Sequence, residues 1–367
     1  MNGQLSPLTR HEANPWAHML SSRVAPKPCV PPMQIVLHIG LHKTATRFLD
    51  HDVFRPLRQH GVAYNPVAIM DALSAAFSGD PSARSAILRE RQRLERTGTS
   101  LLLISRPGIS GDMFDNHRGY LEARDAMRDL FPKARVLLFV RHPPDWLVSA
   151  YRQSLVKGAG GPIETFLNFY GGRFREKPAH HVRGMRNLSA LKLCFADIYR
   201  AYVEAFGEER VYLVRQEDLR DRPEKVRALL AHCLGRALPA EHRRRARNRG
   251  FSALAIFLFC GGWRRPNSAT RIREGRPPRF VRAYLQRPVR RSRAIFIRHI
   301  FDRISYVDWD LLARGGMRRD LERHYRSESE ALKAAASECF KILDQHEPGS
   351  RSPDEPEARP DATTPSR

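Results

Sequence analysis

The sequence predicts an α/β fold in which a central, mostly parallel sheet is flanked by helices on both faces. Short apolar runs rich in Val, Ile and Leu alternate with segments whose apolar residues recur at helical spacing. Such alternation implies parallel strands covered by helices. With 367 residues, 42% of them hydrophobic, the chain can bury a large core.

The first half of the chain carries the clearest elements. Proline ends or kinks a helix, so the helix that follows the first strand should break near Pro56. The expected elements are strand 34–40, helix 44–59, helical segments between 67 and 97, strand 101–105, helix 119–130, strand 135–140 and helix 145–156.

The second half continues the sheet and then becomes helical. Residues 188–206 are apolar at helical spacing and end at Gly207, a typical helix C-cap. Strand 211–215 and helix 223–234 complete the sheet layer, and 317–345 read as a C-terminal helical extension. We therefore expect a flexible segment at 1–33 without a signal peptide, one domain at 34–345 and a disordered tail at 346–367.

Residues 34–49, QIVLHIGLHKTATRFL, form a strand that leads into a lysine-bearing turn and a helix. The unpaired N–H groups at a helix start favour an anion such as phosphate, and Lys43 adds a positive charge. His42 occupies the place where a Walker A motif needs glycine, which disfavours a nucleotide kinase.

A second segment, RHPPDWLVSAYRQ, follows the apolar run 136–140. Pro143 and Pro144 stop the strand, and Asp145 is the expected N-cap of the next helix. Arg141 and Ser149 would then reach one phosphate at the C-terminal edge of the sheet, where parallel sheets bind ligands.

With both motifs in view, the chain resembles the PAPS-dependent sulfotransferases of the bacterial, carbohydrate- or lipid-modifying type. LHKTATRFL is similar to the family's loop for the 5′-phosphosulfate, RHPPDWLVSAYRQ to its segment for the 3′-phosphate, and 206–235 to its later strand, acidic turn and helix. The resemblance covers roughly 34–260. It implies a three-layer, P-loop-like fold, PAPS (3′-phosphoadenosine 5′-phosphosulfate) as donor, PAP as product and no metal.

The resemblance also implies which residues bind the donor. RNRGFS, 247–252, is similar to the segment that in relatives closes over the nucleotide or borders the acceptor. The expected cofactor-binding residues are Lys43, Thr44, Ala45, Thr46, Arg47, Phe48, Arg141, Ser149, Arg249 and Gly250.

The catalytic candidates are Lys43 and His42. Lys43 would neutralise the charge that grows on the leaving phosphate oxygen. Arg106 and Pro107 stand where many relatives carry a glutamate base, so His42 is the nearest titratable group by sequence. Alternatives are a reaction with little base assistance, or a base supplied by His180, His181 or an acid of the cleft.

The acceptor is a hydroxyl or amine of a carbohydrate, lipid or small molecule, with its cleft expected from 60–97 and 157–187. Two rivals remain: a phosphoryl-transfer enzyme with Mg²⁺, and a non-catalytic relative that binds nucleotide or polyanion. The net charge of +24 invites a nucleic-acid partner, but arginine exceeds lysine throughout and no nucleic-acid module is evident.

The runs 251–260 and 294–301 set apolar residues beside arginines, which fits either buried core helices or peripheral contact with an anionic membrane. Neither run is long enough to cross a bilayer. Five cysteines without CxxC spacing indicate no zinc site and no disulfide framework. We expect a cytoplasmic protein, with contact with the inner membrane face as an alternative.

Overall fold

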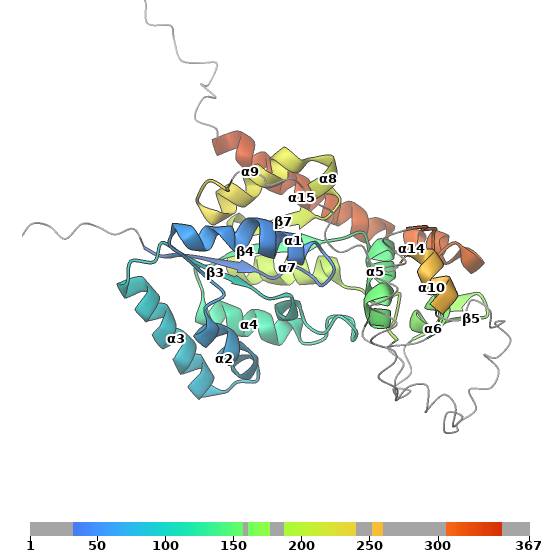
Figure 1. Ribbon diagram of the computed structural model, residues 1–367, viewed down its shortest axis with the longest axis horizontal. Helices are drawn as coiled ribbons and strands as arrows, with labels where there is room; N and C mark the ends of the chain where they lie inside the picture. Colours follow the sequence, from blue (N-terminus) through green and yellow to red (C-terminus); the bar gives the residue numbers. More distant parts are fainter. Residues whose placement is uncertain (1–31, 157–160, 177–186, 240–251, 260–305, 347–367) are drawn as a thin grey trace, which may run out of the picture. The chain divides into compact units, whose positions relative to one another are not determined.

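The computed structural model describes residues 32–156, 161–176, 187–239, 252–259 and 306–346. In this part of the chain, five strands form one sheet in the order β2-β3-β1-β4-β7, and all four neighbouring pairs are parallel (Figure 1). The strands are β1 (Gln34–His38), β2 (Val62–Tyr64), β3 (Leu101–Ser105), β4 (Arg135–Val140) and β7 (Val211–Arg215). The predicted α/β, P-loop-like fold class is confirmed.

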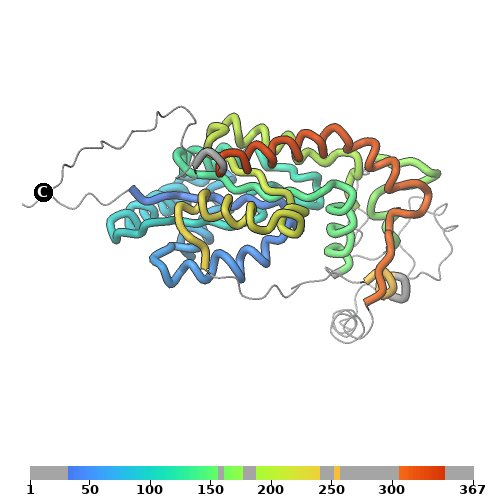
Figure 2. The backbone as a smooth tube through the Cα atoms, turned by 90° about the horizontal axis from the view of Figure 1, so that it is seen from above, coloured from blue at the N-terminus to red at the C-terminus, as the bar shows by residue number. Residues whose placement is uncertain are grey.

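Helices cover both faces of this sheet. Figure 2 shows α1 (Thr46–Phe48) and α9 (Pro223–Leu234) on one side of the strands, and α4 (Tyr120–Leu130) and α7 (Phe195–Phe206) on the other. Because the central strands are covered on both faces, their side chains are buried almost without exception, as in β3 and in β4 after Arg135. This burial explains why the strands read as continuous apolar runs.

The remaining helices are shared between the two halves of the chain. They are α2 (Val67–Phe77), α3 (Pro81–Arg96), α5 (Pro143–Val156), α6 (Ile163–Phe166), α8 (Asp218–Asp221), α10 (Ala253–Phe259), α14 (Met317–His324) and α15 (Arg326–His346). Short 3₁₀ turns lie at Pro56–His60, Pro107–Ser110, Glu208–Arg210 and Arg314–Gly316. A two-stranded hairpin joins β5 (Phe169–Tyr170) to β6 (Arg173–Phe174).

The C-terminal helices are present as predicted, and α15 is more than an extension. It packs against β7, α7 and α9. Cys339 on α15 is buried, and its Sγ accepts a hydrogen bond from the backbone N–H of Leu213 at 3.3 Å. The helix therefore covers the edge strand β7, which protects that edge from pairing with another chain.

Strand β1 ends at His38 rather than at residue 40, and three further expectations differ from the structure. The helix after β1 begins at Thr46 rather than residue 44, because Lys43 and Ala45 adopt left-handed conformations (φ 71° and 62°), and a π-helical turn follows at Leu49–Phe54. Asp145 is not the N-cap of α5, since the helix already begins at Pro143. Proline suits a first helical turn because its missing N–H has no partner to lose there.

The third difference is at 188–194, which is not helical although its apolar spacing suggested a helix. Tyr325 pins this segment: its hydroxyl donates to Ala190 O at 2.6 Å and accepts from Leu193 N at 3.0 Å. Leu188, Ala190 and Leu193 are buried as part of a loop. The apolar pattern here reflects burial rather than helical periodicity.

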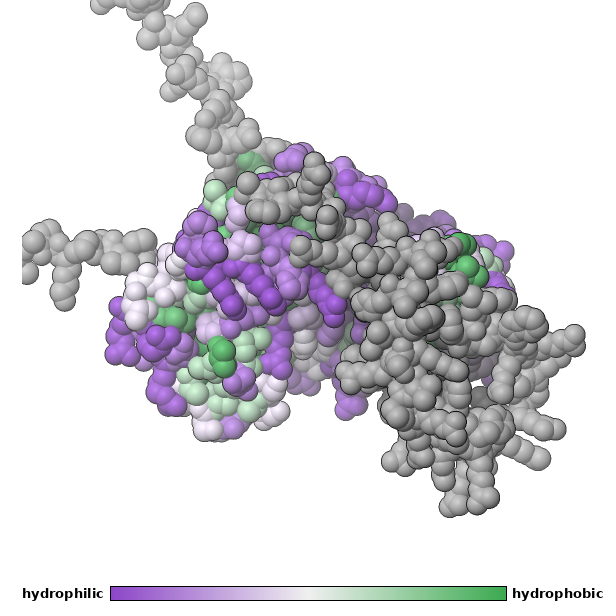
Figure 3. Space-filling model, in the orientation of Figure 1, coloured by the Kyte–Doolittle hydropathy of each residue, from purple (hydrophilic) through white to green (hydrophobic). Residues whose placement is uncertain are grey.

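Hydrophobic side chains also reach the surface. On the face drawn in Figure 3 they gather over α2, where Val67 is 73% exposed. Within the described segments, no helix combines the length and apolarity needed to cross a membrane. In α10, Ala253, Ala255 and Ile256 are buried, which favours a core helix for this run, whereas 294–301 lies outside the described residues.

Candidate functional site

The first residues after β1 continue the hydrogen bonds of the strand to β4 before the loop turns. The backbone N–H groups of Ile39 and Leu41 donate to Leu137 O and Phe139 O, both at 3.1 Å. Gly40 is required because a Cβ there would lie 2.5 Å from Nε2 of the buried His38 ring. The left-handed Lys43 and Ala45 then form the turn into α1. Such conformations cost non-glycine residues energy, and they cluster at ligand-binding sites.

The two loop threonines have different roles. The Thr44 side chain is buried, and its hydroxyl donates to the backbone oxygen of Leu41, so it closes the loop internally. Thr44 therefore has only its backbone N–H to offer an anion. The Thr46 hydroxyl is buried and has no hydrogen-bond partner. A buried polar group without a partner is costly and points to a bound ligand.

Two side chains of helix α5 form hydrogen bonds with the lysine loop. Trp146 Nε1 donates to His42 O at 2.6 Å, and Lys43 Nζ donates to Gln153 Oε1 at 3.3 Å. Gln153 lies four residues after the half-buried Ser149, so both side chains emerge from one face of α5. The structure thereby joins the lysine loop and the Arg141–Ser149 segment, as the sequence predicted. Gln153 was missed, although its spacing from Ser149 was a usable signal.

Arg141 follows β4 and is largely buried. Burial lowers the pKa of Arg141, while the nearby carboxylates Asp145 and Glu217 raise it. The guanidinium remains charged, since arginine is not deprotonated in proteins. Glu217 also accepts a hydrogen bond from the backbone N–H of His142 at 3.0 Å. These contacts fix the start of the segment that is expected to meet the 3′-phosphate.

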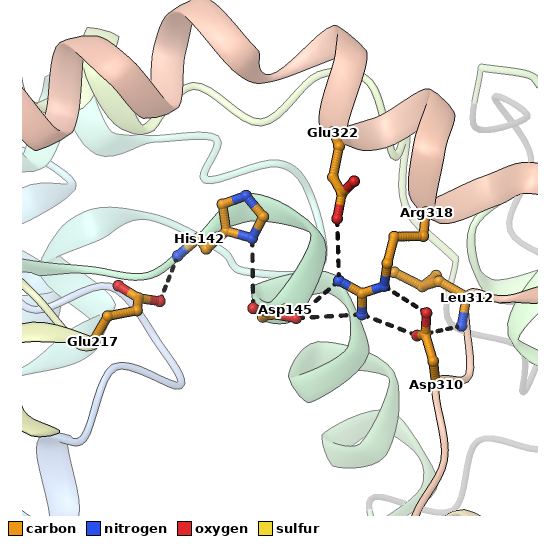
Figure 4. A network of polar contacts seen from close by, with 7 residues as sticks. All are labelled: His142, Asp145, Glu217, Asp310, Leu312, Arg318 and Glu322. Atoms are coloured by element: carbon orange, nitrogen blue, oxygen red, sulfur yellow. Dashed lines mark hydrogen bonds and ion pairs between the residues drawn. The ribbon is translucent and has the colours of Figure 1, made fainter. Parts of the chain in front are cut away.

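Arg318, on α14, ties the C-terminal helices to the start of α5 (Figure 4). Its guanidinium lies 3.3 Å from Asp145, 2.5 Å from Asp310 and 3.7 Å from Glu322. Asp145 also pairs with His142 Nδ1 at 3.4 Å. Hydrogen bonding to His142 and the charge of Arg318 outweigh burial and lower the pKa of Asp145. The first turn of α5 is therefore held by the charge of Arg318, 173 residues away in sequence.

On the other side of β1, a pocket of about 450 Å³, here called the arginine pocket, opens at the ends of β2 and β3. It is lined by Thr46, Arg47, Asp50, Arg55, Arg58, Tyr64, Asn65, Ser105 and Pro107. Ser105 Oγ lies 2.7 Å from His38 Nδ1, which links the pocket floor to the residue beneath Gly40. Arg47, predicted to bind the cofactor, and Tyr64 and Asn65, from the segment predicted to form the acceptor cleft, all line this pocket. Asp50, Arg55 and Arg58 were not predicted as site residues.

Arg106 and Pro107 follow β3, where the resemblance implies a glutamate base. Arg106 donates to Met70 O at 3.0 Å and to Ser74 Oγ at 2.7 Å, so its guanidinium is directed to α2. Pro107 lines the arginine pocket. Neither residue can accept a proton there.

A second pocket of about 520 Å³, here called the histidine pocket, lies past the turn that begins at Pro107. It is lined by His42, Phe77, Gly108, Gly111, Asp112, Met113, Phe114, Arg118, Gly119 and Ala123. Beneath it, the buried His117 ring lies 6.4 Å from the His42 ring and 5.4 Å from Trp146, centre to centre. Burial lowers the pKa of His117 to about 4, so this second histidine is neutral.

The comparisons with known proteins follow this geometry. No protein-family model and no curated protein matches the chain. Among solved structures, it is similar to a sulfotransferase from Alicyclobacillus acidocaldarius, with 17% identity, 59% of this chain and 88% of that chain covered, and a TM-score of 0.40. It is also similar to the sulfotransferase domain from the curacin biosynthetic pathway, with 14% identity, coverage of 57% and 76%, and a TM-score of 0.30.

Both of these solved structures are sulfotransferases, the family that the two sequence motifs resemble. With TM-scores below 0.5, the likeness carries no argument about donor or acceptor. Those must be argued from the side chains of the site. Of the predicted cofactor residues, 43–48 lie in the loop and helix that follow β1, and Arg141 and Ser149 lie in the turn and helix that follow the adjacent strand β4. Arg249 and Gly250 lie outside the described residues.

Proposed function

We propose that the chain transfers a sulfuryl group from PAPS to a hydroxyl or amine of an acceptor. The observation that carries this proposal is the hydrogen bond from Lys43 Nζ to Gln153, because α5 also carries Ser149 and begins directly after Arg141. One helix thus joins the loop proposed for the phosphosulfate to the residues proposed for the 3′-phosphate. The residues present fit such a ligand: Lys43 and Arg141 are cations, and Ser149 offers a hydroxyl.

PAPS supplies an activated sulfuryl group, whose transfer leaves negative charge on a phosphate oxygen. Lys43 neutralises that charge, and Gln153 keeps its ammonium in position before the reaction begins. A cation that needs no reorganisation stabilises the transition state most, and losing such a donor typically costs on the order of 10²–10³ in rate. Arg141 and Ser149 bind the 3′-phosphate, which orients the donor without taking part in the chemistry. Arg249 and Gly250 remain proposed nucleotide contacts.

His42 is the proposed proton acceptor. It is half-buried, its backbone oxygen is fixed by Trp146, and it lines the histidine pocket, where Phe77, Met113 and Phe114 offer an apolar wall for an acceptor. A general base contributes roughly 10²–10⁴ in rate. His42→Gln should therefore lower turnover about 100-fold while leaving PAP affinity within a few-fold. Unchanged turnover would remove His42 as the base, and a large loss of PAP affinity would reassign it to donor binding.

The proposed donor is tested by comparing PAP with AMP, which lacks the 3′-phosphate. Ligand at about 100 times its Kd stabilises a native protein by about 2.7 kcal/mol, which raises the Tm by roughly 5 °C or more. PAP should produce this shift at a concentration where AMP produces little, and Arg141→Ala should abolish the difference. Equal shifts with PAP and AMP would contradict the proposal.

Two controls separate the rival functions. A larger Tm shift with ATP and Mg²⁺ than with PAP would favour phosphoryl transfer. That chemistry needs an acidic Mg²⁺ ligand after a strand, whereas Arg106 and Arg141 follow β3 and β4. PAP binding without PAP release from PAPS, across hydroxyl and amine acceptors, would favour a non-catalytic relative.

A further inference from the structure

The arginine pocket carries an excess of positive charge. Its lining includes three guanidinium groups, from Arg47, Arg55 and Arg58, and one carboxylate, from Asp50. It lies at the ends of β2 and β3, whereas Arg141 and Ser149 follow β4 on the opposite side of β1. The pocket therefore lies on the side of the loop away from the residues proposed for the nucleotide.

The single acid of the pocket is neutralised locally. Arg55 pairs with Asp50 through two hydrogen bonds, Nε to Oδ1 at 3.1 Å and Nη2 to Oδ2 at 3.0 Å, and the Tyr64 hydroxyl donates to Oδ1 at 2.6 Å. Burial would raise the pKa of Asp50, but the hydrogen bonds from Tyr64 and Arg55 outweigh it and lower the pKa. Asp50 is ionised, and its charge is matched by Arg55.

Arg58 has no such match. Its guanidinium lies 5.2 Å above the centre of the Tyr64 ring, and Nη2 donates to Tyr64 O at 3.0 Å. No carboxylate of the described residues forms an ion pair with it. The ring and the carbonyl hold this cation in one place, so little freedom is lost when it binds a ligand.

Thr46 gives the pocket a second unmet donor, because its buried hydroxyl lacks a protein partner. A fixed guanidinium and an unpaired hydroxyl in one pocket suit an anionic group such as a carboxylate or sulfate, which accepts several hydrogen bonds at once. Arg58 is exposed, so water solvates its charge in the free protein, and a neutral ligand would gain no charge-assisted contact with it.

We propose that the arginine pocket binds an anionic substituent of the acceptor, so that the substrate class is an acidic, hydroxyl-bearing molecule such as a sugar that carries a carboxylate or sulfate. This inference rests on the proposed sulfuryl transfer for its acceptor, but its binding site does not overlap Arg141 or Ser149. The pocket selects the acceptor by charge, while the loop holds the donor.

The test compares two probes that differ only at C6 of the sugar, 4-nitrophenyl β-D-glucuronide, with a carboxylate, and 4-nitrophenyl β-D-glucoside, with a hydroxymethyl group. Their Kd values are measured by calorimetry at moderate salt, with and without saturating PAP. The glucuronide should bind at least 10-fold more tightly, the order expected for one charge-assisted contact. The same preference should appear in the rate of PAP formation from PAPS.

Variants assign the preference to the pocket. Arg58→Gln should remove most of it, and Arg58→Lys, which keeps the charge but not the planar fork, should retain part. The matched control is Arg96→Gln, which removes the same charge from an exposed site at the end of α3, near the opposite end of β3 from Ser105. It should leave the preference unchanged. Circular dichroism establishes that each variant is folded.

Several outcomes would overturn the inference. Equal or undetectable binding of the two sugars means that the pocket does not recognise an acidic acceptor. A loss of PAP affinity in Arg58→Gln as large as that in Arg141→Ala means that the pocket belongs to the donor. If the unmodified protein does not bind PAP at all, the proposed donor is wrong, and the sugar comparison without PAP still decides whether the pocket selects anions.

Discussion

Acidification should destabilise this fold strongly, because two buried histidines beneath the site resist protonation. His38 lies under Gly40, and His117 lies beside His42. Burial lowers the pKa of His38 to about 3 and that of His117 to about 4. In the unfolded chain, both should titrate near the ordinary histidine value of about 6.5.

The sign follows from which state binds more protons. Above about pH 6.5 both histidines are neutral in both states, and their contribution to stability is complete. Between that pH and the native pKa values, only the unfolded chain binds the protons, so the free energy of unfolding falls as the pH falls. At pH 5 each histidine should lower the free energy of unfolding by roughly 2 kcal/mol. Together the two histidines should make this free energy change by about 2.5 kcal/mol per pH unit near pH 5.5.

Urea unfolding between pH 7.5 and pH 5, followed by tryptophan fluorescence, measures this slope. His117→Gln should lower the slope to about half, whatever it does to stability at pH 7.5, because one of the two buried titrations is gone. The matched control is His60→Gln, at an exposed histidine, which should keep the full slope. A wild-type slope below about 1 kcal/mol per pH unit, or no change in His117→Gln, would refute the reasoning.

Three further predictions concern the loop, the histidine pocket and α14. Lys43→Ala should lower kcat by about 10²–10³ with a smaller loss of PAP affinity. Gln153→Ala should lower kcat less, because Gln153 only positions the lysine. Steady-state kinetics and PAP titration measure both effects, and equal losses of PAP affinity in the two variants would contradict these separate roles. Gly111→Ala should lower the free energy of unfolding, measured in urea, by about 3 kcal/mol or more, because its φ of 86° is strained for alanine and the new Cβ would lie 2.1 Å from a backbone oxygen. The control Gly61→Ala, with φ 73° and open space around the new Cβ, should lower it by only about 1 kcal/mol. Arg318→Ala should lower the free energy of unfolding by roughly 1–2 kcal/mol and weaken PAP binding several-fold, because the partly exposed ion pairs of Arg318 hold the start of α5. Unchanged PAP affinity would show that α5 is positioned without these ion pairs.

The sequence predicted the elements whose cause is local. Strands 101–105, 135–140 and 211–215 agree with the structure because strands buried on both faces are apolar throughout. The lysine loop was equally visible, since a strand, a turn and a helix follow one another within 15 residues. The short β2 was not predicted, because three residues with a central alanine carry too little pattern.

What the sequence could not supply depends on contacts between distant segments. The loop 188–194 is set by Tyr325, more than 130 residues later. Thr44 and Thr46 look equivalent in sequence, yet the left-handed residues around them turn one hydroxyl into the loop and leave the other unpartnered. Arg58 acquires its place only through Tyr64, on a strand that was not foreseen.

The strand order explains why donor and acceptor should separate across the site. β1 pairs with β3 on one side and β4 on the other, so the connections that follow β3 and β4 begin on opposite sides of β1. Such a switch point opens a crevice between connections that diverge to opposite sides. The connection after β4 brings Arg141 and α5. On the other side, the connection after β1 lines most of the arginine pocket, and the connection after β3 lines most of the histidine pocket. If the donor is held toward β4, its phosphate leaves toward β4. The acceptor nucleophile can then approach the loop from the β3 side, in line with the leaving phosphate. Arg58 and Thr46 line the pocket at that β3 end, together with Pro107. An acid there would repel an anionic acceptor, whereas the arginine attracts it.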